Sequence, residues 1–252
     1  MDNGHNNVAA VGTTYSNQFY TTNFKSSYRL GDNHEQVAIL KANLREYRSK
    51  TPSYLWTGTP SLENNTSTIF DSATEENLKV FQKREGLTAD GIYGAGSRNA
   101  MHAVIGVSPK GWVRVFRSTS AYINYNDTST GLSSDSKYML DHSWVTSTTR
   151  DTLYDLGYSF YQKTNKKIEV NDCSLIDGAD TPEHQTHMNG KIIDIRNAPM
   201  TTTEEKTFLE VAVAHSNVQK VIFKTNHGVS SSKIVVDTSG VHDDHFHVET
   251  YN

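Results

Sequence analysis

Histidines gather in two short segments of this chain. Five of the eleven fall there: "EHQTHMNGKIIDIR" contains His184 and His187, and the closing "VHDDHFHVET" contains His242, His245 and His247. Alternate side chains of a strand point to the same side, so His245 and His247 should share one face, while Phe246 turns to the other face and into the core. His242 and the two aspartates after it precede that strand in a turn, from which they can curl over the same site.

One aspartate stands among apolar residues just after the first histidine segment. Asp194 lies in "KIIDI", and a buried carboxylate is costly unless it is paired or bound to a metal. His187, Asp194 and either His245 or His247 would supply two nitrogens and one oxygen. Three protein ligands with an open fourth position are typical of a catalytic zinc site, and the remaining histidine could act as general base or stabilise the transition state. We therefore expect Zn²⁺ as the cofactor.

Composition narrows the classes of protein that remain. The chain has 252 residues, a net charge of −4 and 35% hydrophobic residues, which indicates a packed globular protein. The acidic balance argues against a nucleic-acid partner, because such proteins usually carry a basic footprint. The single cysteine, Cys173, excludes an internal disulfide and a four-cysteine zinc site, and we expect it to pack in the core.

The sequence indicates neither a membrane span nor a signal peptide. No window approaches 18 consecutive apolar residues, which argues against a membrane span. The first segment, "MDNGHNNVAAVGTTYSNQFY", has neither a basic start nor an apolar stretch of signal-peptide length. If the protein acts outside the cytoplasm, we expect another delivery route or a signal that has already been removed.

The elements that must position the histidines are predicted to form one domain at residues 109–252. Strands are indicated by "WVRVF", "KIEVNDC", "KIIDIR", "KVIFK", "KIVVD" and "HFHVET". One helix places Leu153, Leu156 and Phe160 at helical spacing, and another begins with a capping box at Thr202 and Glu205. Strands and helices mix without the regular alternation of a nucleotide-binding sheet. The prediction is an α+β fold with a central, mostly antiparallel sheet.

The preceding residues are predicted to form a flexible tail at 1–28 and a small three-helix domain at 29–108. The helices are expected at 34–49, after a capping box at Ser72 and Glu75, and at 95–105. Gly86 is placed to end the second helix, and Asp90 with Gly91 indicates a turn. A polar stretch at 51–68 reads as a loop.

The stretch "LKVFQKREGLTADGIYGAGSRNAM" resembles the three-helix family of peptidoglycan-binding domains. The residues that match the family pattern are Val80, Phe81, Gln82, Gly86, Leu87, Asp90, Gly91 and Gly94. Ser97 stands where the family often has Thr, and the loop at 51–68 is longer than usual. The resemblance implies bacterial peptidoglycan as the partner. Read on their own, Phe81 is a core residue and the glycines form turns.

The C-terminal motifs resemble zinc peptidases that cut D-amino-acid peptides in peptidoglycan, and most closely the penicillin-insensitive murein endopeptidases. His187 to Asp194 matches His-x6-Asp, and "HDDHFH" at 242–247 matches the closing motif of that family. Ser174, Gly178 and His184 fall at the matching upstream spacing. The chain departs from the family at Thr186 for Ser, at Ala179 for Gly and at Asp177 for Arg.

This resemblance implies the roles of the site residues. His187, Asp194 and His247 would hold zinc, His245 would be catalytic, and His184 and His242 would line the catalytic site. The implied activity is a murein D,D-endopeptidase that hydrolyses peptide cross-links.

Other readings stay open for activity and for delivery. The chain could be a D,D-carboxypeptidase or an L-Ala–D-Glu endopeptidase with the same metal set, or a non-catalytic wall-binding protein with structural zinc. For delivery, the candidates are a phage endolysin, an effector injected into a rival cell and a processed secreted enzyme.

Overall fold

The computed structural model describes residues 26–105, 108–134, 140–179 and 186–252. These residues divide into two compact units, each described here by itself. The C-terminal unit comprises Lys110–Gly131 and His142–Asn252, and the N-terminal unit comprises the described residues up to Pro109 together with those of Leu132–Asp141. Nearly all of the predicted tail lies outside the described residues.

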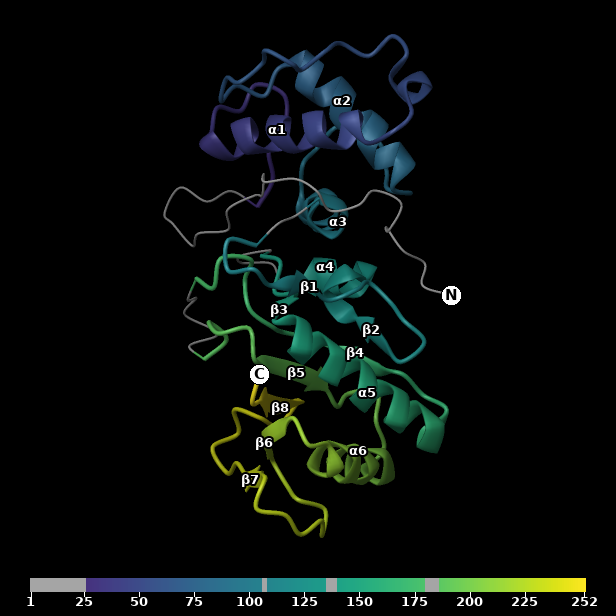
Figure 1. The fold of residues 1–252 in the computed structure, drawn as a ribbon, viewed down its shortest axis with the longest axis vertical. Coiled ribbons are helices and arrows are strands. Elements are labelled where there is room, and N and C mark those ends of the chain that lie inside the picture. The colour runs from purple at the N-terminus through teal and green to yellow at the C-terminus, as the bar shows by residue number, and fades with distance from the viewer. Residues whose placement is uncertain (1–25, 106–107, 135–139, 180–185) are drawn as a thin grey trace. The chain divides into compact units, whose positions relative to one another are not determined.

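The N-terminal unit contains the three predicted helices (Figure 1): α1 Glu35–Ser49, α2 Ser72–Arg84 and α3 Ala95–Ile105. The predicted loop at 51–68 includes a short 3₁₀ helix, η1 Ser53–Trp56. Tyr28, which the sequence placed in the tail, is buried and forms a β-bridge with Tyr93. Asp141, from the second stretch of chain in this unit, lies against α3, and its Oδ2 is 2.8 Å from His102 Nδ1.

Both predicted capping boxes were wrong by one residue. Asp71 caps α2, because its Oδ1 accepts from the backbone N of Thr74 at 2.9 Å. A carboxylate there also complements the positive end of the helix. The second box is formed by Thr201 and Glu204, at the start of α6 Thr202–Ala214. Each time an equally competent cap stood one residue earlier, where the backbone enters the helix.

The turn after α2 is organised by the amide of Gln82. Its Nε2 donates to Asp90 Oδ1 at 2.8 Å, to the Ile92 carbonyl at 3.0 Å and to Ser97 Oγ at 3.0 Å. Its Oε1 accepts from the backbone N of Gly91 at 2.9 Å, and Gly91 has a φ of +73° that favours glycine. The motif that resembles wall-binding domains is thus structural at these positions.

The C-terminal unit is built on a six-stranded sheet, in the order β2-β4-β5-β8-β6-β7. The strands are β2 Tyr122–Asn124, β4 Ile168–Val170, β5 Ile192–Arg196, β6 Val218–Phe223, β7 Ile234–Val236 and β8 His245–Thr250. The three central pairs, β4-β5, β5-β8 and β8-β6, are antiparallel, and the two outer pairs are parallel. The predicted α+β class and the mostly antiparallel sheet are confirmed.

Short elements other than β1 escaped prediction. The predicted strand at "WVRVF" is present as β1 Val113–Arg114, which forms a separate antiparallel pair with β3 Trp144–Val145. Strands β2 and β3, the 3₁₀ helix η2 Tyr125–Asp127 and α4 Ser129–Ser134 were not predicted, because their two to six residues are too few to establish a hydrophobic period. The longer predicted strands and helices of this unit are all present.

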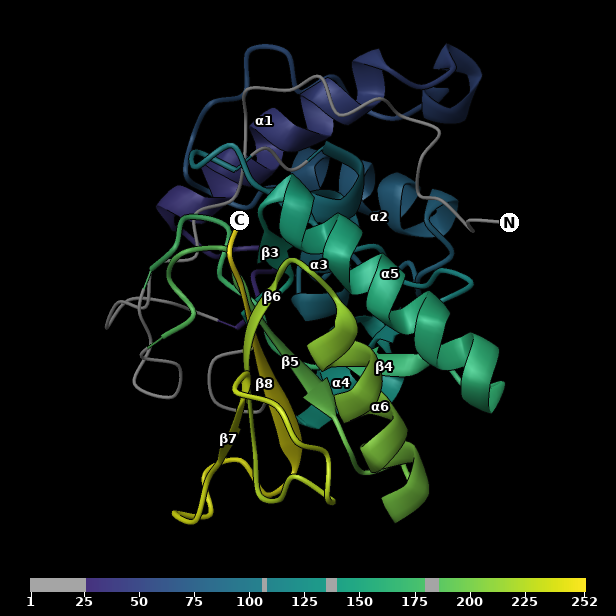
Figure 2. The ribbon, with the colours of Figure 1, turned by 60° about the horizontal axis from the view of Figure 1, so that its bottom comes forward.

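One face of the sheet is covered by α6 and by α5 Ser147–Thr164, as Figure 2 shows. The shared core takes alternate residues of the strands and the apolar stripes of the helices: Ile193, Ile195, Phe246, Val248, Leu153, Leu156, Phe160 and Phe208. The residues between them on β5 and β8 point to the opposite face, which carries the histidines. No helix in the described part of the chain is long and apolar enough for a membrane crossing.

Candidate metal centre

Strand register brings Asp194 and His247 together. Asp194 of β5 pairs directly with His247 of β8, so both side chains project from the same face. His247 Nδ1 lies 3.1 Å from Asp194 Oδ1. His187, from the turn before β5, places Nε2 3.2 Å from Asp194 Oδ2. All three side chains are buried.

These three residues can hold a metal ion. One nitrogen of His187, one oxygen of Asp194 and one nitrogen of His247 all lie within 4.8 Å of one another. The same criterion is met by His242, His245 and His247, so His247 belongs to both groups. The predicted set of two imidazoles and one carboxylate is therefore assembled around Asp194, with the other two histidines beside it.

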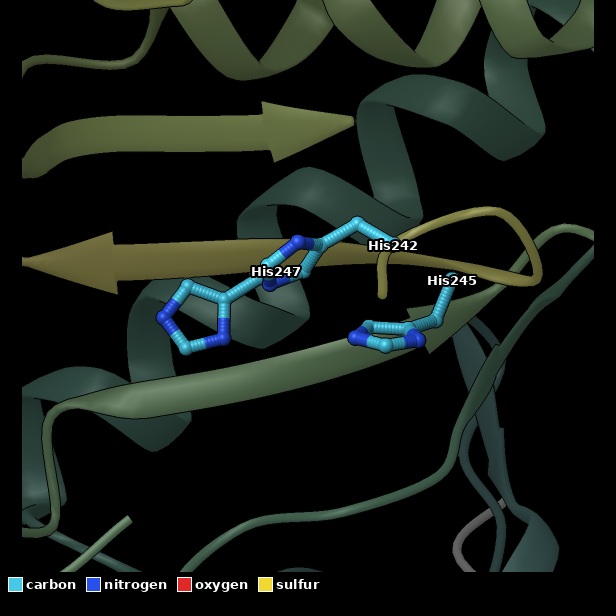
Figure 3. Close-up of side chains that lie close together, drawn as sticks. All are labelled: His242, His245 and His247. Carbon is cyan, nitrogen blue, oxygen red and sulfur yellow. The ribbon is translucent and has the colours of Figure 1, made fainter. Parts of the chain in front are cut away.

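His245 and His242 are each oriented by an aspartate. His245 Nδ1 lies 2.8 Å from Asp244 Oδ1, and its Nε2 faces Asp194 Oδ2 at 3.7 Å. His242 Nδ1 lies 2.8 Å from Asp237 Oδ2, and the ring centroids of His242 and His247 are 5.4 Å apart. Figure 3 shows the three imidazoles gathered on one side of β8. His242 thus overhangs the site from the turn, as expected.

Asp237 was missed by the sequence reasoning, and Asp244 was noted without a role. Asp237 follows β7 directly and accepts hydrogen bonds from Ser239 and His242, which hold the pKa of its carboxyl well below the usual range. A usable signal existed for Asp244, which immediately precedes His245. The sequence contains no such signal for Asp237, because its contact with His242 depends on the conformation of the loop that joins β7 to β8.

Phe246 anchors the strand, as predicted. Its side chain is fully buried on the helix-covered face and stacks on Phe223 with a centroid distance of 3.8 Å. It also contacts Phe208 of α6, with centroids 4.7 Å apart. Because a strand alternates its side chains, fixing Phe246 in the core fixes His245 and His247 on the opposite face.

The electrostatics of the site centre on a buried carboxylate. Burial by itself raises the pKa of Asp194, but the charges and hydrogen bonds of His187, His247 and His245 prevail and hold it far below its usual range. Burial by itself lowers the pKa of His187, but Asp194 and then Asp172 raise it above its ordinary value. The carboxylate therefore stays ionised and attracts either a proton on His187 or a cation between its neighbours.

The far nitrogen of His247 faces another carboxylate. His247 Nε2 lies 3.4 Å from Glu249 Oε1, and the same oxygen is 2.6 Å from Lys220 Nζ. A carboxylate behind a metal-ligating imidazole fixes the ring and leaves the other nitrogen for the metal. This arrangement leaves Nδ1, the nitrogen that faces Asp194, available to a metal ion.

Two glycines support the segment that carries His187. Gly178 and Gly190 have φ angles of +69° and +72°, and a Cβ on either would come within 3.0 Å of the Trp112 ring. Glycine therefore lets the indole lie against this segment. Cys173 is fully buried in the core, as expected. His184, predicted to line the site, lies outside the described residues.

The comparisons with known proteins bear on the N-terminal unit. Residues 33–101 match the family model of a putative peptidoglycan binding domain. No curated protein matches the chain. The matched range contains α1 and α2 and reaches into α3. The chain thus carries a peptidoglycan-binding domain at residues 33–101, which supports peptidoglycan as its partner and the cell wall as its place of action.

Proposed function

We propose that the protein is a zinc-dependent peptidoglycan D,D-endopeptidase that hydrolyses the peptide cross-links of the bacterial cell wall. The observation that carries the proposal is Asp194, a buried carboxylate with His187 and His247 at 3.2 and 3.1 Å and a third, partly exposed histidine facing it. The peptidoglycan-binding domain at residues 33–101 indicates the polymer on which such a site would act.

The donor set fits zinc. Zinc takes imidazole nitrogen and carboxylate oxygen at about 2.0–2.2 Å in tetrahedral sites, so neighbouring donors lie about 3.3 Å apart. His247 Nδ1 lies 3.1 Å from Oδ1 of Asp194 and His187 Nε2 lies 3.2 Å from Oδ2, so each separation approaches that value. His187, Asp194 and His247 would hold the ion and leave the fourth position for water or substrate. When bound, zinc supplies a Lewis acid that polarises a carbonyl and lowers the pKa of water.

The chain's own residues would move the protons. Asp244 accepts from Nδ1 of His245, which fixes the tautomer and leaves Nε2 to take a proton from the attacking water. The imidazolium that forms is stabilised by Asp244 and can stabilise the oxyanion of the tetrahedral intermediate. His242, held by Asp237 and protonated on both ring nitrogens, can deliver a proton from Nε2 to the leaving amine, and the proton taken up by His245 restores it.

The N-terminal unit would raise the rate on the insoluble polymer. A domain that binds the wall holds the linked active site at a high effective concentration of cross-links. Its removal should weaken digestion of intact sacculi while hydrolysis of small soluble muropeptides is retained. This difference separates a targeting domain from one that takes part in the reaction.

The test is digestion of purified murein by the zinc-loaded full chain, followed by mass analysis of the muropeptides. Loss of cross-linked dimers with gain of monomers is the expected result. Loss of terminal D-Ala alone would make the protein a D,D-carboxypeptidase, and stem peptides released by L-Ala–D-Glu cleavage would make it that endopeptidase. An unchanged profile with stoichiometric zinc would make it a wall-binding protein with structural metal and would overturn the proposal.

Delivery to the wall is a separate part of the proposal. A phage endolysin, an injected effector and a processed secreted enzyme each place the same catalytic site on peptidoglycan. A neighbouring gene for a pore-forming lysis protein would identify the first, and genes for a secretion apparatus the second. Finding neither would favour the third.

A further inference from the structure

A second row of side chains runs beside the candidate metal ligands. Arg196 follows Asp194 by two positions on β5, so both point to the histidine-bearing face. It pairs in register with His245, just as Asp194 pairs with His247. Arg196 therefore lies next to the histidine that faces the ligand set, about 6.7 Å along the strand from Asp194.

The guanidinium of Arg196 contacts Tyr125 and Glu169, and its two terminal nitrogens can still donate hydrogen bonds. Its Cζ lies 3.6 Å from the centroid of the Tyr125 ring, and its Nε lies 3.1 Å from Glu169 Oε2. Nε is buried and its contact with Glu169 is an ion pair without a hydrogen bond, while the side chain as a whole is 27% exposed. The terminal nitrogens make no hydrogen bond to any part of the chain that the structure describes. A guanidinium held in this way, with both terminal nitrogens accessible and not hydrogen-bonded, is suited to bind a carboxylate.

The platform beneath Arg196 is itself rigid. Tyr125 begins η2, and Asp127 ends it. Asp127 accepts from both terminal nitrogens of Arg114, at 2.9 and 2.7 Å, in a buried fork-to-fork pair. This pair fixes η2 against β1 and so fixes the Tyr125 ring under Arg196. The donors of Arg196 are therefore held in place before any ligand arrives.

We propose that Arg196 binds the carboxylate on the carbon next to the scissile nitrogen of the substrate. The proposal rests on the proposed function and adds the residue that recognises one chemical group. A free carboxylate stands at that position in the D-Ala to diaminopimelate cross-link, in terminal D-Ala–D-Ala and in the L-Ala–D-Glu bond. In each case the carboxylate lies a few ångströms from the carbonyl under attack, which matches the spacing between Arg196 and Asp194.

The consequence is a preference for acid over amide. A carboxylate on a guanidinium forms charge-assisted hydrogen bonds, whereas a carboxamide forms neutral ones and presents an amino group to the cation. Because the carboxylate is present in substrate and transition state alike, Arg196 should lower KM more than it raises kcat.

The test uses two uncleavable analogues of D-Ala–D-Ala in which a methylene replaces the scissile carbonyl. One has a free C-terminal carboxylate and the other a carboxamide, and calorimetry on the zinc-loaded full chain gives the affinity for each. The native protein should favour the acid at least about tenfold. Arg196→Gln should bring the ratio close to one with zinc content unchanged, and Arg196→Lys should restore part of it.

Arg150→Gln is the matched control, because Arg150 also lies over an aromatic ring, that of Phe116 at 4.6 Å. It should keep the native ratio. A ratio near one in the native protein, or a native ratio in Arg196→Gln, would show that Arg196 only joins β5 to η2 and β4. Muropeptide digestion is scored separately, so a preference for acid without hydrolysis would reject the endopeptidase while keeping the carboxylate site.

Discussion

Lys41 in the N-terminal unit and Asp194 in the C-terminal unit are both buried charges, and their partners differ in kind. Lys41 Nζ donates to Asn65 Oδ1 at 2.8 Å, to Ser67 Oγ at 2.9 Å and to the Ile69 carbonyl at 2.6 Å. These acceptors stay as they are at any ordinary pH. The charge of Asp194 is stabilised mainly by imidazoles, which can lose a proton.

The difference separates a charge that holds a fold from one that awaits a ligand. Lys41 organises the long loop after α1, and its fully buried ammonium needs nothing further. Asp194 needs a cation among its histidines, and a metal ion can take the place of the proton. Each prediction below perturbs one side of this comparison.

Asp194→Asn should have the largest effect. The amide lacks the charge that attracts zinc, so metal content should fall toward zero and hydrolysis by about 1,000-fold or more, since the metal contributes several kcal/mol to the transition state. Atomic absorption and muropeptide release measure the two losses. Asp155→Asn is the matched control. Asp155, on α5, also pairs with a histidine, with 3.5 Å between its Oδ2 and His215 Nε2, but its side chain is far more exposed than that of Asp194. Full activity with intact zinc in Asp194→Asn would sink the ligand assignment.

Lys41→Met should damage the N-terminal unit and leave the metal centre intact. It leaves the Ile69 carbonyl without this donor and removes the cation from Asp71, which should lower the unfolding free energy of that unit by about 2–4 kcal/mol. Denaturant unfolding and zinc content are the two readouts. Lys79→Met, which breaks only the partly exposed pair with Glu75, should cost less than about 0.5 kcal/mol. Equal losses in the two variants would contradict the role given to Lys41.

Asp244→Asn should lower the rate without removing the metal. The carboxylate that orients His245 is lost while the proposed zinc ligands remain, so kcat should fall about tenfold with KM little changed. Steady-state kinetics on a soluble muropeptide give both constants. Asp243→Asn, at the neighbouring exposed position, should behave like the native protein. A normal kcat in Asp244→Asn would show that His245 does not need this partner.

Acid should weaken the cap of α2 in a defined window. Burial alone raises the pKa of Asp71, but hydrogen bonds from Asn65 and Thr74 and the charge of Lys41 lower it to about 2. The unfolded state then binds more protons than the folded state between about pH 4 and pH 2, so the stability from Asp71 is complete above about pH 4 and is lost as pH falls through about 2.

Asp71→Ala tests that window and should have the smallest effect. At neutral pH the lost cap should cost about 1 kcal/mol of stability. The difference from the native protein should shrink as pH falls from about 4 to 2, because the native carboxyl is protonated there. Thermal unfolding at several pH values measures it. A difference that stays constant down to pH 2 would mean that the ionised form is not what stabilises α2.

Much of the fold could be predicted, and the misses have physical causes. Apolar spacing located α1, α3 and α5 to within about two residues, because long amphipathic helices repeat their pattern several times. Two of the short strands, β2 and β3, show no pattern that separates them from loops. The observed helix caps lie one residue before the predicted ones. Asp71 is as able to cap a helix as Ser72, and Thr201 as Thr202, so the sequence alone does not separate them.

The sequence by itself determined the donors and their faces. Alternation along "HFHVET" set His245 and His247 apart from Phe246, and a carboxylate between isoleucines required a cation. Only the tertiary structure decided which groups meet. The register of β5 on β8 pairs Asp194 with His247 and Arg196 with His245, and loops bring Asp237 to His242 and Tyr125 to Arg196. Such contacts join positions far apart in the chain, and their geometry is set by strand pairing and core packing, which no local pattern encodes.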